Sequence, residues 1–343
     1  MTLRARLLDW YDRSARDLPW RRTRDPYAIW VSEIMLQQTR VETVIPYFER
    51  FLARFPDAHA LARASEDEVL SMWSGLGYYR RARMLHRGAA IVSDVHGGRV
   101  PEDPVMRAAL PGIGRYTAGA IGSIAFDRPE PIVDGNVARV LCRLLAIETP
   151  LGSKQTEARL WSEAEKLAQG PRPGALNQSL MELGATVCTP LSPRCAECPL
   201  RASCIARKTD RVGALPVVRK KRAPKPVTMV AVIARPLNDA RAWLVRSEGS
   251  LFGGLFGAPM IEGSDRAAAQ QALAAHGLRG TLGEALGEVE HVLTHRRLKV
   301  HVLTAITEPA RATATRKLLD TDAALDVGVA TLTRKILRLV PRS

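Results

Sequence analysis

Residues 110–136 have the sequence LPGIGRYTAGAIGSIAFDRPEPIVDGN, and the rest of the chain is organised around this stretch. Gly112 and Gly114 allow a tight turn between two helical patterns, because glycine has no Cβ. Such a turn at a helix start directs backbone N–H groups outward at one point, which suits a phosphate. Asp134 stands just before a further amphipathic pattern at residues 137–145. Taken alone, the stretch favours an ordinary helical hairpin with a capping aspartate over a binding site.

A second stretch, DPYAIWVSEIMLQQT at residues 25–39, supplies a candidate acid. Its first two residues predict a helix start, with Asp as the cap and Pro at the first helical position. Glu33 has Ile29 and Leu36 beside it on one face. Loss of solvent raises the pKa of a carboxyl group, so Glu33 is a candidate general acid. The alternative is a half-exposed surface glutamate. Gln38 follows with a polar side chain suited to base edges or phosphates.

These motifs carry a resemblance to a known family. LPGIGRYTAGAI followed by VDGNVARVL resembles the helix-hairpin-helix and catalytic aspartate of the endonuclease III superfamily of DNA glycosylases. SEIMLQQT is similar to the catalytic-glutamate motif of that superfamily. Within it, nearly the whole chain resembles the adenine DNA glycosylases of the MutY type. The resemblance implies a monofunctional base excision repair enzyme, which hydrolyses the N-glycosidic bond of adenine mispaired with 8-oxoguanine or guanine in duplex DNA.

The resemblance also implies roles for particular side chains. Glu33 is expected to protonate adenine, and Asp134 to stay ionised and stabilise the sugar cation. Tyr116 and Asn136 would position these groups, while Gly112 and Gly114 would hold a phosphate near the flipped nucleotide. Tyr78, on the glycine turn GLGYY, resembles the residue that the family inserts into the base stack. The remaining matches to pocket positions are Arg16, Leu18, Trp20 and Gln178.

Four of the five cysteines lie within residues 188–204, spaced as Cys188-x6-Cys195-x2-Cys198-x5-Cys204. Thiolates so close in sequence bind metal or cross-link, and disulfides are disfavoured in the cytosol. Tetrathiolate zinc is the alternative, but zinc sites usually contain two Cys-x2-Cys pairs and this stretch has one. The spacing matches the [4Fe–4S] loop of the resembled superfamily, so we expect that cluster.

The C-terminal part changes character. Residues 208–226 are basic and proline-spaced, which predicts an exposed linker. Residues 227–343 contain alternating strand patterns and one helical pattern, and resemble the Nudix-like C-terminal domain of the same enzymes. The metal-binding carboxylates of a hydrolytic Nudix helix are missing, so this α+β domain is expected to bind and not to cleave. Thr294 and His295 match the loop that recognises 8-oxoguanine in the family, although Leu293 replaces its usual Phe.

The expected fold is therefore multidomain. An all-α glycosylase domain is predicted over residues 1–207, with its helix-hairpin-helix at 110–125 and its iron–sulfur loop at 188–204. The net charge of +15, from 50 Lys+Arg against 35 Asp+Glu, favours a polyanionic partner, most simply double-stranded DNA. No apolar run approaches the ~20 residues that span a bilayer. Acidic residues near the N-terminus argue against a transit peptide, so we expect a cytoplasmic, nucleoid-associated protein. We also expect a monomer.

Two other functions are alternatives to a monofunctional glycosylase. A bifunctional glycosylase/lyase of the endonuclease III kind needs an amine nucleophile for a Schiff base. In that family the lysine follows the hairpin, where this chain has Tyr116. A non-catalytic iron–sulfur DNA-binding protein is the other alternative, and the presence of both Glu33 and Asp134 argues against it.

Overall fold

The structure is a computed structural model that describes residues 2–218, 223–249, 251–320 and 327–340. The chain forms two compact units: residues 1–63 with 84–220, and residues 64–83 with 221–343. The sequence predicts one continuous domain over residues 1–207. It does not predict that residues 64–83 group with the C-terminal part, as they do in the structure. Within the predicted linker, residues 219–222 lie outside the described residues.

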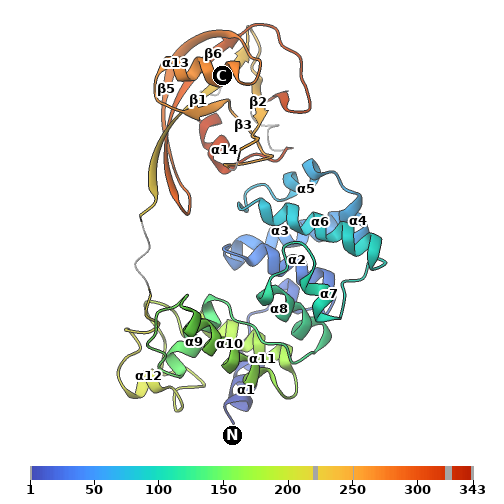
Figure 1. The fold of residues 1–343 in the computed structure, drawn as a ribbon, viewed down its shortest axis with the longest axis vertical. Helices are drawn as coiled ribbons and strands as arrows, with labels where there is room; N and C mark the ends of the chain where they lie inside the picture. The colour runs from blue at the N-terminus through green and yellow to red at the C-terminus, as the bar shows by residue number, and fades with distance from the viewer. Residues whose placement is uncertain (1, 219–222, 250, 321–326, 341–343) are drawn as a thin grey trace. The chain divides into compact units, whose positions relative to one another are not determined.

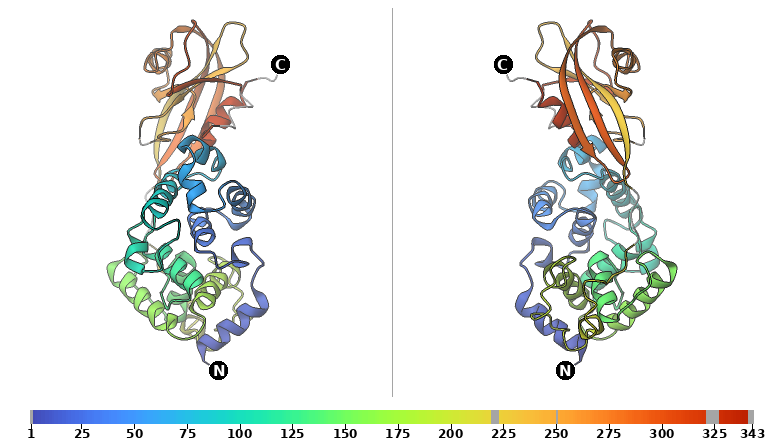
Figure 2. Two further views of the ribbon diagram at one scale, coloured as in Figure 1. Left: turned by 90° about the vertical axis from the view of Figure 1, so that its right-hand side faces the viewer. Right: turned by 90° about the vertical axis from the view of Figure 1, so that its left-hand side faces the viewer.

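The first unit is all-α over its described residues, as the sequence predicts (Figures 1 and 2). Its helices are α1 (Leu3–Ser14), the 3-10 helix η1 (Pro19–Arg21), α2 (Pro26–Leu36), α3 (Val41–Arg54), α4 (Ala58–Arg63), most of α6 (Arg80–Val95), α7 (Pro104–Ala108), α8 (Arg115–Phe126), α9 (Gly135–Leu144), α10 (Lys154–Ala168), α11 (Pro173–Thr186) and α12 (Ile205–Lys208).

Helix α2 is buried on all sides. Asp25 caps it by accepting hydrogen bonds from the backbone N–H groups of Tyr27 and Ala28, at 3.1 and 3.3 Å. Every residue from position 27 to position 35 is buried, Glu33 included. A helix that is apolar around its whole circumference belongs in the interior of a domain. It therefore carries the Glu33 carboxyl group away from water.

The predicted hairpin forms α7 and α8, with a short turn between them. Asp103 caps α7 through the backbone N–H groups of Val105 and Met106. Helix α8 then packs beside α2 and α11, and α11 packs beside α9. Helices α8, α9 and α11 share an apolar core with α1 and α10, and this core contains Ala120, Val137 and Leu180. This packing brings the start of α9, where Asp134 stands, close to α8 and α11.

The second unit contains two sheets. Their strands are β1 (Lys225–Pro236), β2 (Ala242–Arg246), β3 (Phe256–Gly257), β4 (Met260–Glu262), β5 (Gly280–Val292), β6 (Arg296–Thr307) and β7 (Arg316–Leu319). The four-stranded sheet has the order β4-β1-β6-β5, with β1 and β6 parallel, and the three-stranded sheet has the order β3-β2-β7. Successive residues of β1 enter two different apolar cores, as the period of two in a strand requires. Helix α13 (Arg266–Ala274) contributes to one core and α14 (Thr331–Leu337) to the other.

Helix α5 (Glu66–Met72) and the residues after it belong to this second unit. Ser74 Oγ and Tyr79 Oη both donate to the carbonyl oxygen of Val329, at 3.2 and 2.9 Å. The carboxylate of Asp67 pairs with Arg246 at 2.6 Å and with Lys317 at 3.3 Å. Specific hydrogen bonds and ion pairs thus hold residues 64–83 to the C-terminal strands.

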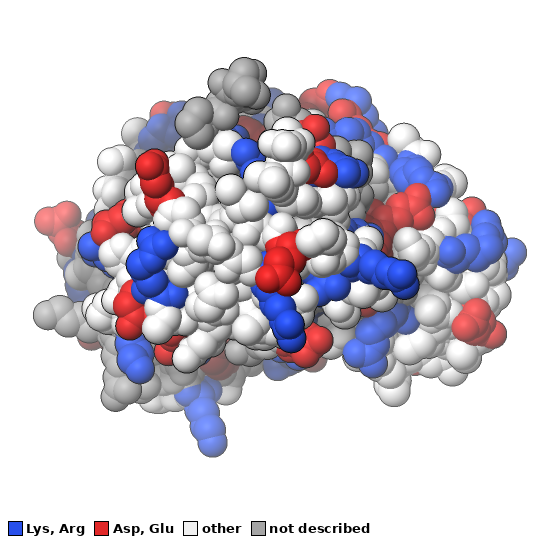
Figure 3. All heavy atoms as spheres, turned by 90° about the horizontal axis from the view of Figure 1, so that it is seen from above, with Lys and Arg blue, Asp and Glu red and all other residues white. Residues whose placement is uncertain are grey.

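Charge on the face shown in Figure 3 is mixed, since Lys and Arg side chains alternate there with Asp and Glu. The excess positive charge does not gather into one uniform patch on this face. None of the helices in the described ranges has the length and apolar character that crossing a membrane requires.

Candidate active site

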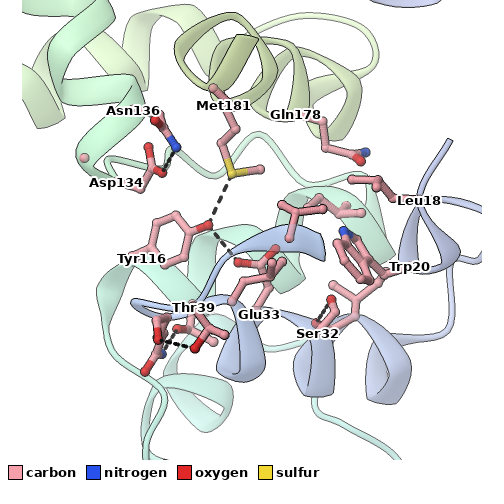
Figure 4. Close-up of a pocket in the computed structure, with 18 of the residues that line it drawn as sticks. Leu18, Trp20, Ser32, Glu33, Thr39, Tyr116, Asp134, Asn136, Gln178 and Met181 are labelled. Carbon is pink, nitrogen blue, oxygen red and sulfur yellow. Dashed lines mark hydrogen bonds between the residues drawn. The ribbon is translucent and has the colours of Figure 1, made fainter. Parts of the chain in front are cut away.

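A pocket of about 770 Å³ opens in the first unit, between η1, α2, the hairpin turn, the start of α9 and α11 (Figure 4). Many of the residues singled out from the sequence line it, although they lie far apart along the chain. These are Arg16, Leu18, Trp20, Glu33, Gln38, Gly112, Gly114, Tyr116, Asp134, Asn136 and Gln178. The fold therefore places two carboxyl groups, a phenol and an apolar wall around one cavity.

Glu33 is the buried acid of this pocket, with 4% of its surface exposed. The hydroxyl of Tyr116 donates to Glu33 Oε2 at 2.7 Å, and the hydroxyl oxygen of Tyr116 also lies 3.2 Å from Met181 Sδ. Burial raises the pKa of Glu33 to about 7; the Tyr116 hydrogen bond opposes the rise, the negative charge of Asp134 adds to it, and Arg21 opposes it. A carboxyl group with a pKa near neutrality can donate a proton at physiological pH.

Asp134 is the N-cap of α9, where helix N–H groups favour a carboxylate. Its Oδ1 accepts from the backbone N–H of Val137 at 2.7 Å, and its Oδ2 accepts from Asn136 Nδ2 at 3.1 Å. Burial raises the pKa of Asp134 above its usual value, while these hydrogen bonds and the charge of Arg139 lower it. The family resemblance implies that Asp134 is ionised; its partial burial, which the sequence does not reveal, works against the charged form.

Glu182 is a buried carboxylate of the pocket that the sequence analysis did not single out. Arg16 Nε donates to it at 2.8 Å and Arg21 Nη2 at 2.7 Å. Burial raises the pKa of Glu182, but the hydrogen bonds from the two guanidinium groups outweigh it and lower the pKa to about 2. Glu182 follows Gln178 by one helical turn on α11, and this spacing is the sequence signal that could have revealed it. The pocket thus contains a permanent anion beside the protonatable Glu33.

The two hairpin glycines differ from each other. Gly112 has a φ of +82°, and a Cβ there would lie 2.8 Å from the Cβ of Met84, so a side chain is both strained and obstructed. Gly114 is extended, with φ −90° and ψ 178°, and a Cβ there would meet no protein atom within 4 Å. Of these two glycines, Gly112 has a backbone conformation that favours glycine, whereas Gly114 has one that any residue adopts and leaves open space at its Cβ position.

The four clustered cysteines lie around one small cavity, with Arg143 and Arg207 beside them. None of them forms a disulfide, and Cys142 is buried in the core, as expected. In the described part of the chain, no three His, Cys, Asp or Glu side chains are placed to hold a single metal ion. Arg139 connects this region to the pocket, because it donates to the carbonyl of Cys188 at 2.7 Å and to Asn136 Oδ1 at 2.8 Å.

The remaining predicted residues lie in the second unit. Tyr78 is 49% exposed and has a φ of +48°, an uncommon conformation for a residue with a side chain. Its hydroxyl lies 3.3 Å from Thr294 Oγ1, in the turn between β5 and β6. His295 is the exposed neighbour of Thr294 in that turn. The structure therefore brings Tyr78 and Thr294 together, although more than 200 residues separate them in sequence.

Comparison with known proteins identifies relatives of this chain. The family described as "HhH-GPD superfamily base excision DNA repair protein" matches residues 31–166. An adenine DNA glycosylase of Rattus norvegicus is 50% identical over 225 residues, which cover 62% of this chain and 44% of the rat protein. An adenine DNA glycosylase of Buchnera aphidicola subsp. Acyrthosiphon pisum is 38% identical over 264 residues, covering 76% of this chain and 75% of that protein.

Among solved structures, a thermostable thymine-DNA glycosylase is 30% identical to this chain with a TM-score of 0.54. The match covers 60% of this chain and 95% of that protein. The chain spans less than half the length of the rat relative, so the similarity to that protein concerns the shared region alone.

Proposed function

The chain belongs to the family of adenine DNA glycosylases, and from that membership we propose that it hydrolyses the N-glycosidic bond of adenine in duplex DNA. The observation that carries the proposal is the pair of carboxyl groups in one pocket, Glu33 with a pKa near 7 and Asp134 at a helix N-terminus. Breaking this bond needs an acid for the leaving base and a negative charge for the sugar cation, as in glycoside hydrolysis.

In the proposed mechanism, the adenine leaves the base stack and enters the pocket. Protonated Glu33 donates its proton to the base, which converts a poor leaving group into a better one. Tyr116 holds Glu33 through its hydroxyl, and the ionised form of Asp134 stabilises the positive charge that develops on the sugar. Glu33, now a carboxylate, then takes a proton from the attacking water.

The walls of the pocket suit a flat heterocyclic base. Leu18 and Trp20 are nearly buried and supply apolar surface, and the indole of Trp20 is fixed edge-on against Phe48 at 5.5 Å. Gln178 supplies amide hydrogen bonding, and its Oε1 accepts from Tyr11 Oη at 3.1 Å. Apolar walls with a few fixed polar groups are the usual composition of a small-molecule site.

Base release from a duplex with adenine opposite 8-oxoguanine, or opposite guanine, tests the proposal directly. We expect free adenine and an intact sugar–phosphate backbone. Among the described residues no lysine lines the pocket, which supports hydrolysis without a Schiff base. Borohydride trapping of an enzyme–DNA cross-link would instead support the glycosylase/lyase alternative, and duplex binding without adenine release would support a non-catalytic protein.

The cysteine cavity fits an iron–sulfur cluster better than zinc, in our proposal. The four cysteines share one cavity, and their stretch contains one Cys-x2-Cys pair where zinc sites usually contain two. Cys188, Cys195, Cys198 and Cys204 would hold a [4Fe–4S] cluster, which would cross-link residues 188–204 and supply no step of base release.

The cluster proposal predicts a brown protein with about four irons per chain. Cys142→Ala is the matched control, because Cys142 is buried in the core and does not line the cavity, so its loss should leave the visible absorption intact. Cys198→Ser should lower both the iron content and the absorption. A colourless, fully active protein with one zinc per chain would contradict the cluster.

The second unit is proposed to be a Nudix-like domain that recognises 8-oxoguanine opposite the adenine. Tyr78 and Thr294 meet in it at an exposed edge, which supports contact with an opened duplex. Because residues 64–83 belong to this unit, removal of residues 221–343 would also strip Tyr78 of its surroundings. Point substitutions therefore test base recognition more cleanly than truncation.

Replacing both Thr294 and His295 with Ala should reduce the preference for 8-oxoguanine over guanine about tenfold, since a few lost polar contacts have that effect. The rate on adenine opposite guanine should change little, because the pocket lies in the first unit. Thr304→Ala, at a partly buried threonine on β6 of the same unit, is the control. An unchanged ratio of the two rates would remove Thr294 and His295 from base recognition.

A further inference from the structure

Arg107 is a charged side chain buried outside the pocket, with no exposed side-chain surface. Its Nε donates to the carbonyl of Ala118 at 3.0 Å, and its Nη1 donates to the carbonyls of Pro101 and Glu102 at 3.1 and 2.7 Å. Its Nη2 donates to both carboxylate oxygens of Glu130, at 2.6 and 2.5 Å. A buried guanidinium needs such partners, and here each nitrogen has one.

Glu130 lies in residues 127–134, a segment without helix or strand that leads from α8 to Asp134. Arg107 holds its side chain, and Asn177 on α11 holds its main chain by donating to its carbonyl oxygen at 2.8 Å. Asn177 is itself buried and also bonds Ser123 of α8 at 2.8 Å. The segment is therefore fixed at Glu130 from two sides, by α7 and by α11.

Helix α8 leaves room for this arrangement. A Cβ on Gly122 would overlap the carboxylate of Glu130 and the guanidinium of Arg107. A Cβ on Gly119 would overlap the carbonyl oxygen of Pro131. Because neither residue has a side chain, the backbone of the segment lies directly against α8, and small displacements of the segment are sterically restricted.

The guanidinium of Arg107 thus bonds both α8, which bears Tyr116, and the segment that leads to Asp134. Ala118 stands two residues after Tyr116 on α8, and Glu130 stands four residues before Asp134. We propose that Arg107 and Glu130 are positioning residues, which fix the Asp134 carboxylate relative to the Tyr116–Glu33 pair. Neither side chain lines the pocket, so they act through the backbone and not by touching the substrate. The proposal rests on the proposed function, since it assigns the pair a part in base release.

The test compares Arg107→Lys and Glu130→Gln with the unaltered protein in single-turnover base release. Lysine keeps the positive charge but cannot bond four groups at once, and glutamine keeps one acceptor for Arg107. We expect the rate to fall at least about tenfold for Arg107→Lys and less for Glu130→Gln, because misplacement by about 1 Å is costly in catalysis. Binding of a duplex with a non-cleavable adenine analogue should change less than about twofold, because phosphate contacts dominate affinity.

The matched control is Asp12→Asn, which removes the Arg172–Asp12 ion pair between α1 and the start of α11. That pair is 2.6 Å long, but its side chains are half exposed, so the rate should be unchanged. Glu130→Gln keeps the proposal testable if Arg107→Lys does not fold.

Hydrogen exchange gives a readout that does not depend on activity. The backbone N–H of Val137 donates to Asp134 Oδ1. Hydrogen exchange in residues 131–137 should therefore accelerate in Arg107→Lys and in Glu130→Gln, and not in Asp12→Asn. Unchanged exchange there, with a rate loss that tracks thermal stability alone, would make the pair purely structural and overturn the proposal. If the unaltered protein releases no adenine, the proposed function fails, and exchange still decides whether the pair orders the Asp134 segment.

Discussion

Glu33→Gln abolishes most base release: the single-turnover rate on adenine opposite 8-oxoguanine should fall on the order of a thousandfold, the usual contribution of a general acid. Glutamine fills the same space and keeps an oxygen that can accept the Tyr116 hydroxyl, now bonded to Glu33 at 2.7 Å. It cannot donate a titrating proton to the base. The measurement is adenine release by excess enzyme, with duplex affinity determined in parallel and expected to be unchanged.

The pH dependence follows from the same group. Burial raises the pKa of Glu33 to about 7, so the acid form is lost, and the rate should fall, as the pH rises through this value. The exposed glutamate at position 49 supplies the control: Glu49→Gln should leave the rate and its pH profile unchanged. Near-normal release by Glu33→Gln, with unaltered duplex binding, would return Glu33 to a structural role.

At high pH, Glu33→Gln should raise the stability of the protein although it lowers the activity. The pKa of Glu33 is higher in the folded state than its unfolded value of 4.5, so its contribution to folding is full below that value and is lost as the pH rises through about 7. The difference corresponds to about 3 kcal/mol. Glu33→Gln has no such loss, so its midpoint of thermal unfolding should exceed that of the unaltered protein at about pH 8 and match it much more closely at about pH 5.

Asp134→Asn should reduce single-turnover release by about 10²–10³-fold, because it removes the negative charge that faces the developing sugar cation. Asparagine is as good an N-cap as aspartate, so α9 should keep its start and the protein its fold. The side chain keeps an oxygen for the backbone N–H of Val137, now at 2.7 Å from Oδ1. Adenine release and the circular dichroism of the helical unit are the two measurements.

A second capping aspartate gives this prediction a close control. Asp103 caps α7 through two backbone N–H groups but does not line the pocket. Asp103→Asn should therefore retain the rate as well as the fold. Equal rate losses in the two variants would mean that capping, and not the charge in the pocket, explains the effect of Asp134→Asn. The double variant with Glu33→Gln should be little slower than the slower single variant, because both groups serve one transition state.

The sequence reveals the site where its signals are local. Ile29 and Leu36 beside Glu33 predict a desolvated carboxyl group, and the buried α2 provides it. Asp134 just before an amphipathic pattern predicts a helix cap, which the structure confirms. Glu182 was missed because its partners Arg16 and Arg21 lie about 160 residues away, and its spacing of one helical turn from Gln178 does not by itself distinguish it from a surface glutamate. The burial that raises the pKa of Asp134 likewise depends on the packing of several helices.

Residues 64–83 show a further limit of local patterns. Ser65 followed by Glu68 has the pattern of a capping box, which predicts a helix start, and GLGYY predicts a turn. Helix α5 forms with Ser65 as its N-cap. The attachment of residues 64–83 to Val329, Arg246 and Arg334 depends on strands and loops far along the chain. No period or motif within residues 64–83 carries that information.

This attachment has a consequence for the order of events on the ribosome. Arg334, which donates to Ser74 Oγ at 2.6 Å, is made roughly 250 residues after position 83. At about 5–20 residues per second, residues 64–83 remain without these partners for roughly 12–50 seconds. Meanwhile residues 1–63 and 84–220 can already form the first unit. Leu70, against which Gly328 packs, lacks this neighbour until then, so the nascent chain contains an incompletely packed apolar segment of the kind that chaperones protect.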